Sequence, residues 1–312
     1  MATTGQISTT SARGGYAFLP WLDSDFRKQA QAEMRFAQFA RVKKAFGLRK
    51  GKVMNFDKRG RVNDAGSSLG ETTRVPKSYF PIDQGTLTIG EYGNAIMLTE
   101  FVEDIAQLSI KTAGVDELRD DAARVKDAAI EAEMDNCAIR AVGTATASTI
   151  FTTDGTATAT AGSNLNKYHV RKIVDYLKVN NAPPARSGNY WSICTIQAYS
   201  GLYEEIESLT MYTTLDNAAK GEVGRYYNTR FVTETNAMDN TIGASSVTGE
   251  AYFFGKDGTV MEGMAKPLHL RFDEEDFGRE QYIAWLETCG YRLIWRNGDT
   301  ITQVRTVKWC SA

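Results

Sequence analysis

The feature that most constrains this chain is a long stretch, residues 115–142, that contains no glycine or proline. Small or apolar residues recur along it every three or four positions, which places them on one helical face. They are Leu118, Ala122, Val125, Ala129, Ala132 and Ile139. At 1.5 Å per residue the helix would be roughly 40 Å long. The pattern therefore predicts one amphipathic helix that acts as the spine of an α+β fold.

The composition is that of a globular protein. The 312 residues are 42% hydrophobic and 24% charged, with a formal net charge of −2, so neither disorder nor a global attraction to nucleic acid is indicated. No apolar run reaches the roughly 18 residues that a membrane helix needs, and the polar residues 1–15 predict no signal peptide. The four cysteines form no CxxC pair, which favours reduced thiols over a disulfide framework or a zinc site.

The N-terminal region is basic. Residues 23–52 hold nine Lys or Arg against three acids, and apolar residues between positions 26 and 46 predict a helix that ends before Gly47. Such an arm could face a polyanion or an acidic neighbour. A solvated helix face is the alternative interpretation.

Residues 49–98 predict a long β-hairpin with a polar tip. Strand-like segments at 52–56, 86–89 and 95–99 are separated by charged and glycine-rich turns. An isolated two-stranded ribbon is only marginally stable in water. The ribbon therefore needs a surface to lie on, and that surface need not belong to its own subunit.

The remainder predicts mixed α/β structure. A hairpin is expected within 143–162 around Asp154-Gly155, with a flexible linker as the alternative. A closing two-stranded ribbon is expected to pair 282–295 with 300–309 through a turn at Asn297-Gly298. The other expected elements are helices at 99–110, 166–179 and 199–206 and strands at 190–196, 230–234 and 251–255.

Few residues suggest catalysis. His169 and His269 stand alone, and the sequence contains no Walker loop, GxSxG elbow or HExxH motif. The acidic run 273–276 could serve glycoside hydrolysis or bind a hard cation. Four consecutive acids on a turn are more typical of a solvated surface, so we predict no catalytic residue, no cofactor and no metal site.

Several short phrases, in this order, resemble major capsid proteins of tailed phages with the Hong Kong 97-type fold, and most of all the phage N-four family. They are KGKV at 50–53, YG at 92–93 followed by AIMLTE at 95–100, MD at 134–135, GEVG at 221–224 and RFV at 230–232, with the closing ribbon after them. The resemblance extends from about residue 25 to 310.

This resemblance implies an N-terminal arm (1–48), an extended loop (49–98), a peripheral domain containing the spine (99–164), an axial domain (165–265) and a peripheral return ribbon (266–312). It implies a non-enzymatic major capsid protein that assembles as hexamers and pentamers into an icosahedral phage head around double-stranded DNA. The implied partners are further copies of the chain, the packaged DNA, a portal and a scaffold or decoration protein. The implied location is the virion, after assembly in the bacterial cytoplasm.

The charged residues expected at contacts between subunits lie on the arm, the extended loop and the loop near residue 222. They are Lys43, Lys44, Lys58, Arg59, Arg61, Asp64, Glu71, Glu222 and Arg225. Two other functions stay open. One is the shell of an encapsulin-type cellular compartment, and the other is a carbohydrate-active enzyme that uses the acidic run 273–276.

Overall fold

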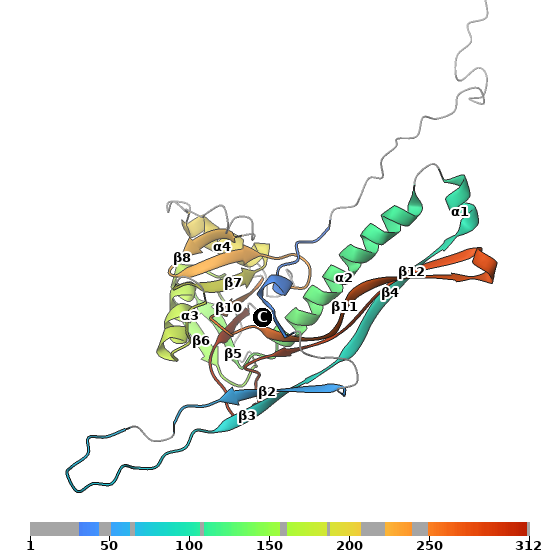
Figure 1. The fold of residues 1–312 in the computed structure, drawn as a ribbon. Coiled ribbons are helices and arrows are strands. Elements are labelled where there is room, and N and C mark those ends of the chain that lie inside the picture. The colour runs from blue at the N-terminus through green and yellow to red at the C-terminus, as the bar shows by residue number, and fades with distance from the viewer. Residues whose placement is uncertain are drawn as a thin grey trace, which may run out of the picture.

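The computed structural model describes residues 31–43, 51–62, 66–106, 109–156, 161–185, 188–206, 222–238 and 249–310. These ranges form two β-sheets, a separate two-stranded ribbon and one long helix that contacts both sheets (Figure 1).

The seven-stranded sheet has the order β6-β5-β13-β10-β7-β9-β8. Its strands are β5 Ile139–Ala145, β6 Ser148–Thr152, β7 Tyr190–Cys194, β8 Glu222–Tyr226, β9 Thr229–Thr233, β10 Glu250–Phe254 and β13 Thr306–Cys310. Helix α3 (Lys167–Val179) buries Val170, Ile173 and Leu177 in a cluster with sheet residues that include Phe253 and Trp309. Helix α4 (Ile196–Ile206) adds Leu202 to the same cluster.

The four-stranded sheet has the order β1-β11-β12-β4 and forms the elongated part of the molecule (Figure 1). Its strands are β1 Arg41–Lys43, β4 Gly90–Thr99, β11 Val260–Glu275 and β12 Glu280–Leu293. A short turn, η2 (Asp276–Gly278), joins β11 to β12. Strands β2 (Val53–Arg59) and β3 (Ile82–Thr88) make the separate antiparallel ribbon.

The spine helix α2 spans Ile110–Met134, with Ser109 as the N-cap whose hydroxyl accepts the Thr112 N–H at 3.4 Å. Its N-terminal half packs Leu118 and Ala122 against Ile283 and Trp285 of β12. Its C-terminal half packs Ile130 and Met134 into a cluster that also contains residues of the seven-stranded sheet. The helix therefore fixes the two sheets relative to each other.

The predicted spine was correct in kind but displaced along the chain. The helix begins five residues earlier than predicted, and residues 139–142, which were expected to be helical, belong to β5 instead. Ile139, Ala141 and Val142 are buried in β5, where a branched apolar run suits a strand as well as a helix.

The predicted N-terminal helix is wrong for the described part of that segment. Phe36–Phe39 forms a 3-10 helix, and Arg41–Lys43 forms β1, which runs parallel to the start of β11. The phenylalanines that suggested a helical face instead pack on aromatic residues of the seven-stranded sheet. Phe36 meets Tyr252 at 5.8 Å between ring centroids, and Phe39 meets Trp191 at 5.1 Å. Tertiary packing overrides the local helical pattern here.

The predicted closing ribbon is also wrong. Residues 282–293 belong to β12, which pairs with β11 and β4, whereas β13 lies between β5 and β10 in the other sheet. Gly298 does adopt a left-handed φ of 83°, so the turn exists, but the chain leaves it toward a different sheet. Strand β11 was missed because Gly263 and Pro267 interrupt its pattern, and the register shifts at Lys266 accommodate that interruption.

Other differences from the prediction concern where elements end and which strands pair. Segment 95–99 belongs to β4 and pairs with β12 rather than with the ribbon. The 143–162 region does contain a hairpin, but β5 and β6 turn at residues 146–147 and not at Asp154-Gly155. The predicted helix at 99–110 is shorter, α1 Glu100–Ile105, and is followed by the start of α2. The predicted helices α3 and α4 and strands β7, β9 and β10 are confirmed within a few residues.

Candidate intersubunit surfaces

The ribbon is attached to the sheet by a small apolar cluster at its base. Alternate residues of β2 face inward, so that Met54 and Phe56 are buried while their neighbours are exposed. Met54, Leu87 and Ile89 form a cluster that contacts Met261 and Ala265 of β11.

Two glycines let the ribbon approach the sheet closely. Gly263 of β11 and Gly290 of β12 are paired directly opposite each other. A Cβ on Gly290 would lie 2.2 Å from the Thr88 carbonyl oxygen, and a Cβ on Gly263 would lie 2.9 Å from Leu87 Cδ2. Arg292 adds a hydrogen bond to the Thr86 carbonyl at 2.8 Å. The ribbon thus crosses the sheet where the sheet has no side chains.

Lys58 anchors the ribbon through charge. Its side chain is buried, and Nζ donates to Asp299 Oδ2 at 2.5 Å and lies 3.4 Å from Asp83 Oδ2. Asp299 also accepts from Arg292 at 2.7 Å. The Ile301 N–H has the largest effect and lowers the pKa of Asp83. Burial opposes it, and the Lys58 ammonium adds to the lowering, so that the pKa of Asp83 is below its usual range. The prediction that Lys58 contacts a neighbour is therefore corrected, because this lysine is bonded within its own subunit.

Beyond its base the ribbon opens into a loop without a core, drawn at the lower left of Figure 1. Among the described residues from 59 to 82 none is buried, and the backbone closes at Gly60, whose N–H donates to the Pro81 carbonyl at 2.9 Å. Large apolar side chains are exposed along it: Val62, Leu69, Val75, Tyr79, Phe80 and Ile82. Such a run of exposed apolar side chains is typical of a surface that another molecule covers.

The structure places the other predicted contact residues in several regions. Arg59, Arg61 and Glu71 are exposed on the extended loop, where Arg59 lies over the Phe80 ring at 5.8 Å. Lys43 is exposed on β1. Arg225 is exposed on β8 and donates to Asn189 at 3.2 Å. Lys44, Asp64 and the side chain of Glu222 lie outside the described residues. The structure therefore gathers three of the nine residues on one loop and leaves Lys43 and Arg225 on separate strands.

A basic cavity of about 350 Å³ lies at the base of the ribbon and is named the basic groove here. Its apolar lining is Phe56, Met261, Ile294 and Trp295, and its cations are Arg41, Lys43, Lys58, Arg59 and Arg305, against Asp57 and Asp257. Arg305 stacks over Trp295 with its guanidinium carbon 4.8 Å from the ring centroid. Sequence reasoning missed this groove because its lining comes from five separate segments.

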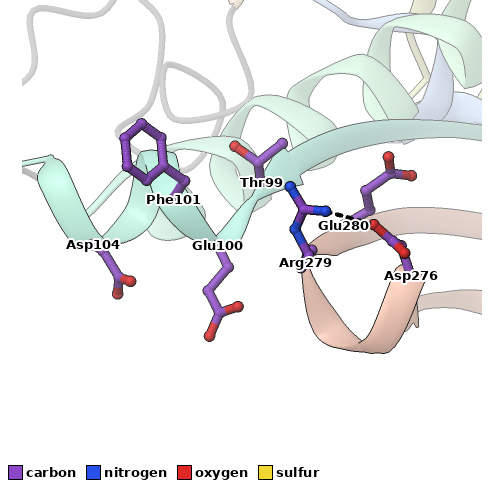
Figure 2. Close-up of a pocket in the computed structure, with 7 residues that line it drawn as sticks. All are labelled: Thr99, Glu100, Phe101, Asp104, Asp276, Arg279 and Glu280. Atoms are coloured by element: carbon purple, nitrogen blue, oxygen red, sulfur yellow. Dashed lines mark hydrogen bonds and ion pairs between the residues drawn. The ribbon is translucent and has the colours of Figure 1, made fainter.

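The opposite end of the four-stranded sheet is acidic and is named the acidic tip, comprising residues 99–105 and 272–280. Figure 2 shows four of its carboxylates, those of Glu100, Asp104, Asp276 and Glu280, which line a pocket of about 450 Å³ together with Arg279. Arg279 lies 3.3 Å from Asp276, and its carbonyl accepts the Glu100 N–H at 3.0 Å. The tip carries eight carboxylates against this one arginine.

The turn at the acidic tip holds an unusual backbone. Asp276, Phe277 and Gly278 have φ values of 47°, 58° and 93°, all in the left-handed region. That region is unfavourable for a bulky residue such as phenylalanine. The Phe277 ring is fully exposed, and Phe101, Ile105 and Phe272 are also mostly exposed nearby.

Buried charges tie the spine helix to both sheets. Lys126 of α2 donates to the buried Glu262 at 2.7 Å and lies 3.9 Å from Glu287. Lys308 of β13 lies between Asp135, at 2.5 Å, and Glu250, at 2.8 Å. These lysines compensate carboxylates that could not otherwise be buried.

Two further buried carboxylates hold the N-terminal segment and a turn. Asp127 Oδ1 accepts the Ala37 N–H at 3.0 Å. Glu234 accepts the N–H groups of residues 236, 237 and 238. Burial raises the pKa of Glu234 to about 7, with a smaller contribution from the charge of Asp127, against the opposing effect of the three N–H donors.

The candidate catalytic groups do not come together. His169 is buried and its Nδ1 bonds to the Thr149 hydroxyl at 2.7 Å, whereas His269 is half-exposed on β11. The acidic run 273–276 is exposed, and in the described ranges no three His, Cys, Asp or Glu residues are arranged to hold a metal. Burial raises the pKa of Cys137 to about 11, which keeps this thiol protonated. None of the helices in the described part of the chain is long and apolar enough to cross a membrane.

Comparison with known proteins identifies the fold. No protein-family model and no curated protein matches the chain. Among solved structures, the capsid of Ralstonia phage GP4 is 13% identical over 98% of this chain and 99% of that chain, with a TM-score of 0.73. The acid-stable capsid of Helicobacter pylori bacteriophage KHP30 is 11% identical over 99% of both chains, with a TM-score of 0.67. The capsid of the native GTA particle is 13% identical over 99% and 100%, with a TM-score of 0.64. The predicted α+β capsid fold is confirmed.

Proposed function

We propose that this chain is a major capsid protein that assembles as hexamers and pentamers into an icosahedral phage head enclosing double-stranded DNA. The observation that carries the proposal is the likeness in fold to phage capsid chains over nearly the whole length of both partners. A match confined to one sheet would fit many functions, but these matches cover 98% and 99% of this chain.

The extended loop supports a shell function by its own chemistry. Between residues 59 and 82 it exposes six large apolar side chains, and none of the described residues there is buried, so the ordering of this part requires contact with another surface. In the proposed shell it reaches over a neighbouring copy of the chain. In this proposal residues 165–265 form the axial domain, and residues 99–164 and 266–312 form the peripheral domain. The seven-stranded sheet takes strands from both, because β5, β6 and β13 belong to the peripheral ranges.

The proposed role is structural rather than enzymatic. Its partners are many copies of the same chain, the enclosed DNA, a portal and a scaffold or decoration protein. Its location is the virion, after assembly in the cytoplasm of a bacterial host.

Electron microscopy of the purified chain, expressed alone and with its neighbouring phage genes, tests the proposal. We expect closed icosahedral shells, or rings of five and six subunits, whose subunit density fits the present fold. Protein that stays monomeric under every assembly condition, and that is absent from particles containing DNA, would contradict it. Shells filled with a cargo protein instead of DNA would indicate a cellular compartment.

A further inference from the structure

The two ends of the elongated sheet carry opposite charge. The acidic tip has eight carboxylates and one arginine. Of the five cations of the basic groove, Lys58 is paired with Asp83 and Asp299, and Arg41 and Arg305 are paired with Asp257, so Lys43 and Arg59 supply its positive charge. Both surfaces also contain apolar groups: exposed phenylalanines on the tip, and Phe56, Met261, Ile294 and Trp295 in the groove. Opposite potentials combined with apolar contact are what complementary protein surfaces share.

The shapes are complementary as well. Phe277 projects fully into solvent from a turn whose backbone is left-handed at three successive residues. Holding an aromatic side chain there is unfavourable both for the backbone and for hydration of the ring. The groove offers a concave space of about 350 Å³ with Trp295 in its lining, which suits an aromatic side chain.

The tip cannot reach the groove of its own subunit. Met261 lines the groove and Asp273 belongs to the tip, and both lie on the single strand β11. Twelve residues of extended chain separate them by roughly 40 Å. Any contact between these surfaces must therefore join two molecules.

We propose that the acidic tip of one copy docks in the basic groove of a second copy, with Phe277 seated against Trp295 and the carboxylates of 273–276 facing Lys43 and Arg59. The inference rests on the proposed function, since it names the surface that the tip would contact in the shell. Each copy carries one tip and one groove, so the contact is head-to-tail and can extend a lattice.

A photo-crosslinking amino acid at position 277 tests the pairing in the assembled full chain. We expect crosslinked peptides from residues 41–59, 257–261 or 294–305 of another copy, identified by mass spectrometry. Crosslinks to residues 272–280, to the loop 61–80 or to a different protein would overturn the proposal, as would assembled particles that give no crosslink. A probe at Leu268, which is exposed midway along β11, is the matched control and should not reach the groove.

A substitution at Phe277 can distinguish its role in the contact between copies from its role in folding. Phe277→Gly removes the ring, and it suits the left-handed φ, so we expect the melting temperature to stay equal or rise. The protein concentration needed for half-maximal assembly, measured by light scattering, should rise at least about tenfold. An unchanged assembly concentration would overturn the role of Phe277.

Charge reversal tests the partner. Glu274→Lys with Glu275→Lys should weaken assembly at least about tenfold, and Lys43→Glu with Arg59→Glu should do the same. All four changes together should restore assembly to within about threefold of wild type. Glu91→Lys, an exposed change on β4, is the control. Failure of the combined variant to recover while shells of wild type form would reject this contact and leave the capsid function intact. Open lattices that never close, with position 277 crosslinked to the groove, would support this contact and contradict the proposed closed shell.

Discussion

At the scale of single residues, stability depends on lysines that neutralise buried carboxylates. Lys308 has a nearly buried side chain and contacts both Asp135 and the buried Glu250. Its attraction to these two groups outweighs the cost of burial and raises the pKa of Lys308. The ion pair joins the end of the spine helix to β10 and β13.

Replacing Lys308 with methionine leaves Glu250 buried without a cation. We expect the free energy of unfolding to fall by about 3–5 kcal/mol, measured by urea denaturation of unassembled subunits. Adding Glu250→Gln should recover part of that loss, because the uncompensated charge disappears. Equal free energies of unfolding for the single variant and wild type would show that the Glu250 carboxylate is hydrated in the variant.

Glu234 makes stability depend on pH. Its pKa is about 7 in the folded state, and 4.5 is the ordinary value, so the folded state binds the proton more tightly. The stabilisation that this group contributes is therefore fully present below pH 4.5 and is lost as pH rises through 7. The difference is on the order of 3 kcal/mol.

We expect Glu234→Gln to flatten this part of the stability profile. Urea unfolding of both proteins between pH 4.5 and 8 would measure it. Parallel profiles for the two proteins would show that Glu234 titrates alike in the folded and unfolded chains.

At the scale of elements, the ribbon can cross the sheet closely because Gly263 and Gly290 have no side chain at the crossing. Gly290→Ala places a methyl group 2.2 Å from the Thr88 carbonyl, and a backbone atom cannot move aside as a side chain can. We expect a loss of about 1–3 kcal/mol and displacement of the ribbon. Gly263→Ala is the matched control, because its nearest neighbour is the end of the Leu87 side chain and the effect should be smaller. Thermal melts and protease cleavage within 59–82 would measure both.

Elements with local patterns could be predicted from the sequence, and those that depend on distant partners could not. Helix α3 has a complete apolar face and an Asn166 cap, so its limits were nearly correct. Phe36 and Phe39 have helical spacing, but their positions are set by Tyr252 and Trp191, more than 150 residues away. β11 contains a proline and two register shifts, and only its long pairing with β12 makes it a strand.

At the scale of the whole molecule, residues 61–80 of the extended loop can be removed without separating the two strands of the ribbon. Gly60 and Pro81 are already joined by a hydrogen bond, so an Asn-Gly turn can replace residues 61–80. Since Lys58 and the apolar cluster at the base remain, we expect a melting temperature within a few degrees of wild type and loss of shell formation. Replacing the same residues by a Gly/Ser segment of equal length separates the contacts of the loop from its length. Normal shells from both variants would contradict an intersubunit role.

The candidate surfaces were only partly predictable. The extended loop was recognised because its strands are short and its tip is polar, which is a local property. Lys58 was misassigned because its partner Asp299 is 241 residues away. The acidic run 273–276 was identified, but its position on a tip beside α1 required the pairing of β11, β12 and β4.

The order of strands in the seven-stranded sheet has a consequence for synthesis of the chain. The strand made last among those described, β13, lies between β5 and β10 and hydrogen-bonds to both. While the ribosome is still translating, residues 139–152 have no bridge to the rest of the sheet, and the Lys308 ion pair is absent. Contacts this distant in sequence form late in folding. The seven-stranded sheet can therefore be completed only after translation has passed residue 310.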